Sequence, residues 1–119
     1  MAQDRPTADE LLEALGEFLE EKVFPKVEGA TQFHTRVAMN VVKILRRELA
    51  DAPVFDAAER GRLQRLLLSD EADLTKLNEA LCKEIQSGSF DERRSELIDH
   101  LKATVQNKLE IANPKYLGE

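Results

Sequence analysis

The stretch TQFHTRVAMNVVKILRREL, residues 31–49, has the most regular pattern in the chain and decides the predicted fold. Successive side chains of a helix advance by about 100°, so this stretch predicts one helix with two different faces. The apolar face comprises Phe33, His34, Val37, Ala38, Val41, Ile44 and Leu45. The other face comprises Arg36, Asn40, Lys43 and Arg47, here called the basic ridge, with Arg46 beside it. We expect the apolar face to point into the core of the protein.

A first helix is predicted over residues 7–24, where apolar residues recur three or four positions apart. Thr7 is a good helix-capping residue and Glu10 follows three positions later, so the pair predicts a capping box. Pro25 should end this helix, because proline lacks the N–H that the next helical hydrogen bond needs.

Three more helices are predicted beyond the central one, which should span about residues 30–50. Asp51–Pro53 should break the chain, because proline disfavours a helical conformation in the residue before it. Asp56 and Glu59 then have the spacing of a second capping box, which predicts the start of a third helix. The fourth helix is expected over residues 72–86.

The fifth helix is expected to begin with Asp91 as its cap and to end before Pro114. The predicted architecture is all-α: a single-domain bundle of about five antiparallel helices joined by short loops. The domain is expected to span residues 1–119, with flexible ends at residues 1–6 and 115–119. The first, second and fifth helices should form the main core, and the third and fourth should form a hairpin across it.

Composition limits the classes of function. The chain has 119 residues and a net charge of -6, which argues against general nucleic-acid binding. Its single cysteine cannot form an internal disulfide, which is typical of a reducing compartment. The sequence has no apolar run near 18 residues and no signal-peptide pattern, so we expect a cytoplasmic protein without a membrane partner.

Candidate residues for catalysis are few. His34 lies within the apolar face of the central helix, so we expect it to be a structural polar residue of the core. His100 lies at the edge of the apolar stripe of the last helix, where we expect it to face solvent. Cys82 is interpreted as a small, partly buried hydrophobe. The sequence contains no phosphate-binding glycine motif and no metal-ligand spacing, so we predict no enzymatic activity, no cofactor and no metal site.

The basic ridge allows two interpretations. It is either a solvated face that pairs with the glutamate-rich side of the first helix, or a docking surface for an acidic partner or a phosphate-bearing ligand. Arginine suits the second role because its planar guanidinium grips a carboxylate or phosphate with two hydrogen bonds.

Several segments together resemble a known family. They are RPTADELLEALGEFLEEKVFP (5–25), QFHTRVAMNVVKILRREL (32–49), LTKLNEALCKEIQSG (74–88) and HLKATVQNKLEIANPKYL (100–117). The most specific pieces are Phe33-His34-x-Arg36-Val37-Ala38-x-Asn40 and Asn113-Pro114-x-Tyr116-Leu117. The chain resembles a small bacterial all-helical family of formerly unknown function, encoded beside aminoglycoside-phosphotransferase-like kinases and acyl-CoA dehydrogenases. That family includes the accessory subunit of the 4-hydroxyacyl-CoA kinase of levulinate catabolism.

The resemblance implies a non-catalytic accessory subunit that binds such a kinase in acyl-CoA catabolism. It adds Asn113 and Tyr116 to the partner- or ligand-binding candidates Arg36, Asn40, Lys43 and Arg47. If the second and fifth helices are antiparallel, the two motifs should meet at one end of the bundle. The alternative for Asn113 and Tyr116 is a structural role in capping the last helix and packing the tail. Two other functions stay open, namely a stand-alone bundle that binds acyl-CoA (a CoA thioester) or another small ligand, and a structural homo-oligomer.

Overall fold

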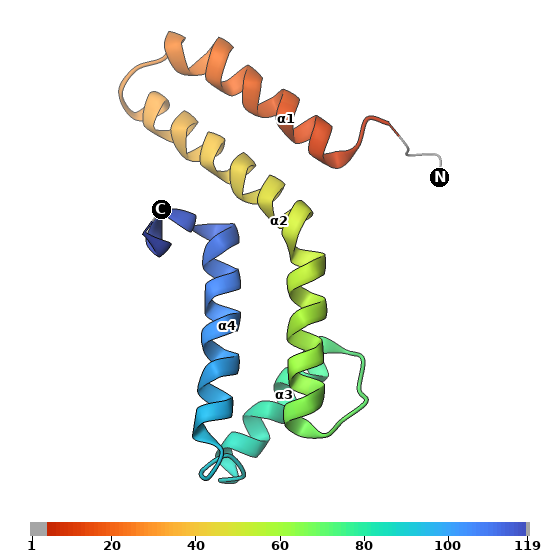
Figure 1. The fold of residues 1–119 in the computed structure, drawn as a ribbon. Helices are drawn as coiled ribbons and strands as arrows, with labels where there is room; N and C mark the ends of the chain where they lie inside the picture. Colours follow the sequence, from red (N-terminus) through yellow and green to blue (C-terminus); the bar gives the residue numbers. More distant parts are fainter. Residues whose placement is uncertain (1–4, 119) are drawn as a thin grey trace. The chain divides into compact units, whose positions relative to one another are not determined.

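A computed structural model describes residues 5–118, and all regular structure within that range is helical. In chain order the elements are α1 (Ala8–Phe18), η1 (Leu19–Val23), η2 (Phe24–Lys26), α2 (Gly29–Leu67), α3 (Leu74–Gln86), α4 (Arg94–Ala112) and η3 (Pro114–Leu117) (Figure 1). The all-α prediction is confirmed, with four α-helices in the described residues rather than about five. None of these helices is both long enough and apolar enough to cross a membrane.

The chain divides into two compact units, which are described separately: unit 1 is Met1–Asp51 and unit 2 is Ala52–Glu119. The single domain expected over residues 1–119 stays a prediction. Of the ends expected to be flexible, residues 1–4 and 119 lie outside the described range, whereas residues 115–117 belong to the 3-10 turn η3.

The start of α1 confirms the predicted capping box. The Thr7 hydroxyl accepts a hydrogen bond from the Glu10 backbone N–H at 3.1 Å, and the Glu10 carboxylate accepts one from the Thr7 backbone N–H at 3.0 Å. The two side chains thus satisfy backbone donors that have no partner inside the helix. After Phe18 the chain continues through a π-helical turn and then a 3-10 turn that contains Pro25, close to the predicted end.

The predicted break at Asp51–Pro53 is wrong, because α2 continues through it and merges the second and third predicted helices. Pro53 lies inside this helix of 39 residues. The fixed φ of proline fits a helix, although Pro53 lacks the N–H that would bond the Leu49 carbonyl and a proline ring inside a helix also crowds that carbonyl. Glu59 therefore caps no helix; its carboxylate accepts a hydrogen bond from the Asn78 side chain at 3.1 Å.

The later boundaries are shifted from the predicted ones. Asp73 caps α3, and its carboxylate accepts a hydrogen bond from the Lys76 N–H at 3.1 Å. Gly88 follows α3 with φ of 85°, a conformation that glycine adopts without strain. Asp91 does not cap α4, because it lies in the turn before Arg93, which holds the cap position.

The tightest core lies in unit 2, so the prediction that the first, second and fifth helices form it is wrong. Its buried members are Leu63, Leu77, Leu81 and Phe90, and Leu66, Leu67, Leu74 and Leu97 pack against them. These residues come from the end of α2, from α3, from the following turn and from the start of α4. The loops around α3 are short, which brings three segments with strong leucine stripes into one cluster.

Truncating the core should therefore destabilise the protein strongly. Leu63 is fully buried, so Leu63→Ala should lower the free energy of unfolding by about 3 kcal/mol, through lost burial and the cavity left behind. The matched control is Leu68→Ala, since Leu68 is 91% exposed. Urea unfolding followed by circular dichroism measures both variants, and equal losses in the two would contradict this placement of the core.

Candidate functional site

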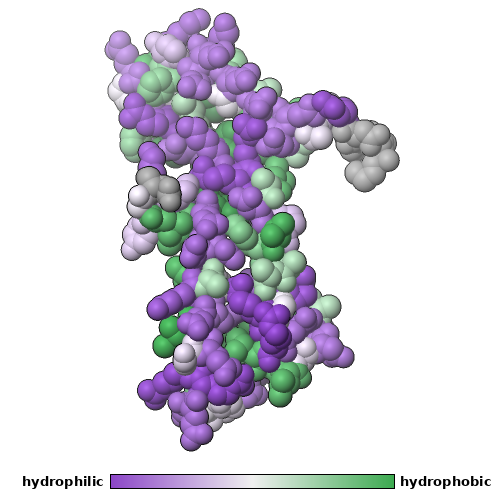
Figure 2. All heavy atoms as spheres, in the orientation of Figure 1, coloured by the Kyte–Doolittle hydropathy of each residue, from purple (hydrophilic) through white to green (hydrophobic). Residues whose placement is uncertain are grey.

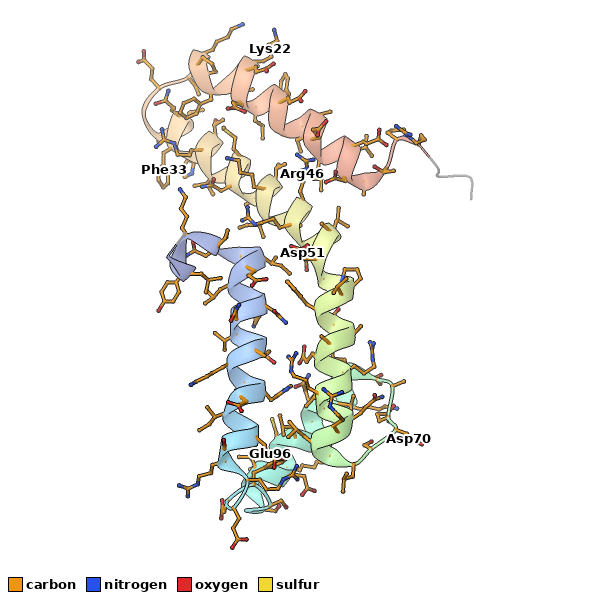
Figure 3. The ribbon with its side chains drawn as sticks, in the orientation of Figure 1. Lys22, Phe33, Arg46, Asp51, Asp70 and Glu96 are labelled. Atoms are coloured by element: carbon orange, nitrogen blue, oxygen red, sulfur yellow. The ribbon has the colours of Figure 1, made fainter. Side chains whose placement is uncertain are left out.

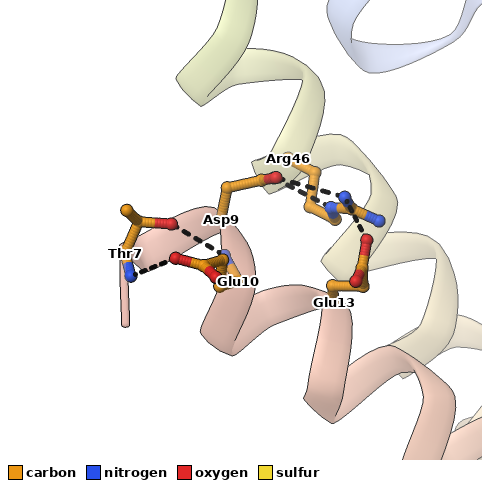
Figure 4. A network of polar contacts seen from close by, with 5 residues as sticks. All are labelled: Thr7, Asp9, Glu10, Glu13 and Arg46. Carbon is orange, nitrogen blue, oxygen red and sulfur yellow. Dashed lines mark hydrogen bonds and ion pairs between the residues drawn. The ribbon is translucent and has the colours of Figure 1, made fainter. Parts of the chain in front are cut away.

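Unit 1 is built from α1 and the first half of α2, which lie side by side and antiparallel (Figure 1). Arg46 joins them: its guanidinium donates to Asp9 Oδ1 at 2.8 Å, to Asp9 Oδ2 at 3.2 Å and to Glu13 Oε2 at 3.1 Å (Figure 4). A Cβ on Gly16 would lie 3.4 Å from Val42 Cγ1, so the missing side chain allows close helix packing. Arg46, the neighbour of the basic ridge, thus pairs with acidic residues of α1, whereas both interpretations of the ridge itself stay predictions.

These polar contacts shift the pKa values of the carboxyl groups that take part. The hydrogen bonds from Arg46 hold the pKa of Asp9 below its usual value, and the same pairing raises the pKa of Arg46. Hydrogen bonds from the Thr7 backbone and from Arg5 lower the pKa of Glu10. Both carboxylates therefore stay charged at neutral pH, and the charge pairing that links α1 to α2 persists there.

Most of the face of α2 that was predicted to enter the core is exposed instead, although Ala38 and Ile44 of that face are half-buried. Phe33 is 62% exposed, and Val37, Val41 and Leu45 are each at least 40% exposed. We call these four residues the apolar stripe of α2. The residues of this segment that are buried are Thr35 and Val42, which lie on another face of the helix. Contact with α1 thus turned the helix so that most of its large apolar side chains reach solvent.

Apolar side chains are also visible at the surface of the molecule. Figure 2 shows green apolar atoms breaking the hydrophilic surface rather than lying hidden beneath it. Figure 3 labels Phe33 near the start of α2 and Arg46 further along the same helix. Single exposed apolar side chains are normal on a protein surface, whereas a large contiguous apolar patch is typical of interaction sites.

The basic ridge lies next to this stripe on the same helix. Asn40 is only about 20° from Phe33 around the helix axis, so ridge and stripe form one continuous surface. Arg36, Asn40 and Lys43 are exposed, and the Arg36 guanidinium lies 5.1 Å from the centre of the Phe24 ring. Lys43 and Arg47 also line a shallow hollow of about 590 Å³ together with Asp9. We call the stripe and the ridge together the α2 docking surface.

Both histidines occupy environments opposite to those predicted. His34 is exposed, and its ring stands edge-on to Phe33 with 5.5 Å between ring centres, so it is no core residue. His100 is only 3% exposed rather than solvent-facing. The reason is the rotation of each helix, because each turns a face toward its neighbour that its apolar pattern alone did not indicate.

His100 belongs to a polar cluster between α2 and α4 in unit 2. Arg62 donates from Nε to His100 Nδ1 at 3.0 Å and from Nη2 to Thr104 Oγ1 at 3.1 Å. Burial lowers the pKa of His100 and the positive charge of Arg62 lowers it further, whereas Glu59 opposes the shift. The sequence pattern did not predict this cluster, although one signal was present: His100 and Thr104 are four residues apart and share a helix face.

The second motif of the resemblance lies in unit 2. Asn113 follows the last residue of α4; its N–H donates to the Leu109 carbonyl at 2.8 Å and its carbonyl accepts from the Tyr116 N–H at 3.1 Å. Tyr116 is 74% exposed. Asn113 therefore has the structural capping role, while Tyr116 stays available for contact. The joint polar site of the two motifs stays a prediction.

Residues 5–118 contain no group of three or more histidine, cysteine or acidic residues that could hold a metal ion.

Comparison with known proteins gives one family. The family model described as Domain of unknown function (DUF6285) matches residues 25–116, which contain α2, α3 and α4. No curated protein and no solved structure matches the chain.

Acid should weaken unit 2 through His100. In the unfolded chain this residue has the ordinary pKa near 6.5, and in the folded chain its pKa is lower. The stabilising contribution is therefore complete above pH 6.5 and is lost as the pH falls below that value toward the folded pKa. Urea unfolding at a series of pH values should show this loss.

The histidine variants supply the controls. His100→Gln keeps an acceptor for Arg62 but does not titrate, so its stability should change less with pH over this window. His34→Gln removes the exposed histidine and should retain the pH dependence of the parent chain. Identical pH profiles for the parent and His100→Gln would contradict the assignment.

Proposed function

The chain belongs to the DUF6285 family, and from that premise we propose that it is a cytoplasmic, non-catalytic partner subunit that works by binding another protein. The resemblance of the segments quoted above suggests which protein. The proposed partner is an aminoglycoside-phosphotransferase-like kinase that phosphorylates a hydroxyacyl-CoA in acyl-CoA catabolism.

The observation that carries this proposal is the α2 docking surface. It combines the apolar stripe, each member of which is at least 40% exposed, with a basic ridge along one edge. A protein interface has this anatomy, with an apolar centre and charged groups at its rim. Covering the exposed half of each stripe residue would contribute on the order of 1 kcal/mol per residue, before the cost of association.

Charge supports the choice of an acidic partner surface. The chain as a whole carries a net charge of -6, yet the ridge presents Arg36 and Lys43 to solvent. A partner with acidic groups beside an apolar groove would be drawn to this side of the protein in preference to the others. Such rim charges act mainly on the rate of encounter and on register, while the apolar stripe supplies the affinity.

The central test is co-expression with a kinase of the proposed aminoglycoside-phosphotransferase-like class, followed by size-exclusion chromatography and a kinase assay. We expect a stable complex, and activity that depends on the small subunit. Val41→Glu should weaken the complex by about tenfold or more, because it places a charge in the centre of the stripe. The matched control is Val54→Glu, an exposed valine of α2 outside the stripe. Separate elution, with kinase activity unaffected by the small subunit, would refute the proposal.

The ridge gives a second, kinetic prediction. Reversing charge with Arg36→Glu and Lys43→Glu together should slow association several-fold at low salt, with less change in the dissociation rate. The difference from the parent should shrink as salt is raised, because exposed charges are screened within about 10 Å at 0.1 M salt. Surface plasmon resonance against the immobilised kinase measures both rates. A parent-like association rate would place the partner elsewhere on the chain.

A further inference from the structure

Helix α4 packs with its polar side inward. The residues that it turns toward the rest of unit 2 include His100, which is buried, and Thr104, which is half-buried, and both accept hydrogen bonds from Arg62. Three of its large apolar residues point away from this contact: Ile98, Leu101 and Val105 are 42–54% exposed. The centre of that apolar set is roughly 120° from the inward face around the helix axis.

This orientation is held by specific contacts. Rotating α4 to bury its apolar set would break both hydrogen bonds from Arg62 and leave a half-buried guanidinium without its acceptors, which is costly. At the start of the helix, Leu97 packs against the core cluster, and Arg93 donates to the Leu66 carbonyl at 3.2 Å. These contacts fix the rotation of α4 and therefore keep its apolar residues on the outside of unit 2.

The exposed apolar side chains form a groove of about 390 Å³. It is lined by Ile98, Leu101, Val105 and Leu109 of α4 and by Leu117 of η3, with Lys102 and Gln106 along one edge. The α4 residues recur at intervals of three, four and four, so the groove runs along the helix axis for three turns. An open apolar groove with anchors at these intervals suits the apolar face of another helix, which has anchors at the same intervals.

Basic residues border this groove. Lys102 lies on one side of the apolar set, Lys108 lies on the other, and Arg94 stands one turn before Ile98 on the same face. All three are exposed. The nearest acidic residues of α4, Asp99 and Glu110, lie further from the centre of the groove around the helix. A second copy of α4 would therefore bring lysines against lysines, whereas acidic flanks on an incoming helix would meet opposite charge.

We infer that the groove formed by α4 and η3 binds an amphipathic helix of a partner protein, with apolar anchors in the groove and acidic residues along both edges. This surface belongs to unit 2 and shares no residue with the α2 docking surface, so it does not rest on the proposed kinase. The helix can come from the proposed kinase or from another protein. In either case the groove requires apolar anchors and acidic flanking residues on that helix.

The test uses the full chain and a synthetic probe. The probe is a helical peptide of about 18 residues with leucines at i, i+3, i+7 and i+11 and glutamates flanking them. The matched peptide has lysines in place of the glutamates. In ¹⁵N-labelled protein, the acidic peptide should shift amide resonances of residues 98–109 and 117, and the basic peptide should bind at least about tenfold more weakly.

Variants separate this site from the others. Val105→Glu should weaken binding of the acidic peptide by about tenfold or more, and Val41→Glu, on the α2 docking surface, should leave it unchanged. The double variant Lys102→Glu, Lys108→Glu keeps the apolar groove and should weaken peptide binding several-fold at low salt. It tests the site even if Val105→Glu does not fold.

Three outcomes would overturn the inference. The first is equal binding of the two peptides, which would remove the electrostatic basis. The second is a parent chain that light scattering shows to be a dimer and that Val105→Glu converts to a monomer, because a second copy would then occupy the groove. The third is saturable binding of decanoate that shifts the same amide resonances and is not displaced by the acidic peptide. The groove would then hold an acyl chain.

Discussion

A helix that packs along a narrow strip can bury only part of its surface, and this limit governs both units of the protein. In unit 1, α2 turns Thr35 and Val42 inward and leaves its apolar stripe in solvent. In unit 2, α4 turns its polar side toward Arg62 and leaves a second apolar set outside. The contacts that hold each helix at a given rotation decide which of its side chains are buried. The amphipathic pattern of the sequence alone does not specify that rotation.

The exposed apolar surfaces share a further property. Each one lies next to basic side chains, Arg36 and Lys43 beside the stripe of α2 and Lys102 and Lys108 beside the groove of α4, although the chain has a net charge of -6. Like charges facing each other across an interface oppose self-association, and opposite charges favour a partner with acidic edges. The charge beside each exposed apolar surface is therefore opposite in sign to the net charge of the chain.

Sequence patterns were reliable where the physics is local. The Thr7–Glu10 capping box involves residues three positions apart, and both of its hydrogen bonds are present. Gly88 occupies a left-handed conformation after α3, which glycine adopts without strain. The local rule that proline ends a helix fails at Pro53. The residues before and after Pro53 continue one helix, which tolerates the missing N–H. Of the docking candidates, the basic ridge could be predicted from spacing, but its apolar neighbour was assigned to the core.

By itself, the sequence determined the all-helical class, the capped start of α1 and the grouping of Arg36, Asn40, Lys43 and Arg47 on one helix face. These follow from intervals of three and four residues along a regular helix, which hold in any tertiary arrangement. Only the tertiary structure decided that His100 is buried, that His34 is exposed and that two apolar surfaces face solvent. Those outcomes depend on helix rotation, which contacts distant in sequence set, such as Arg46 with Asp9 and Arg62 with His100.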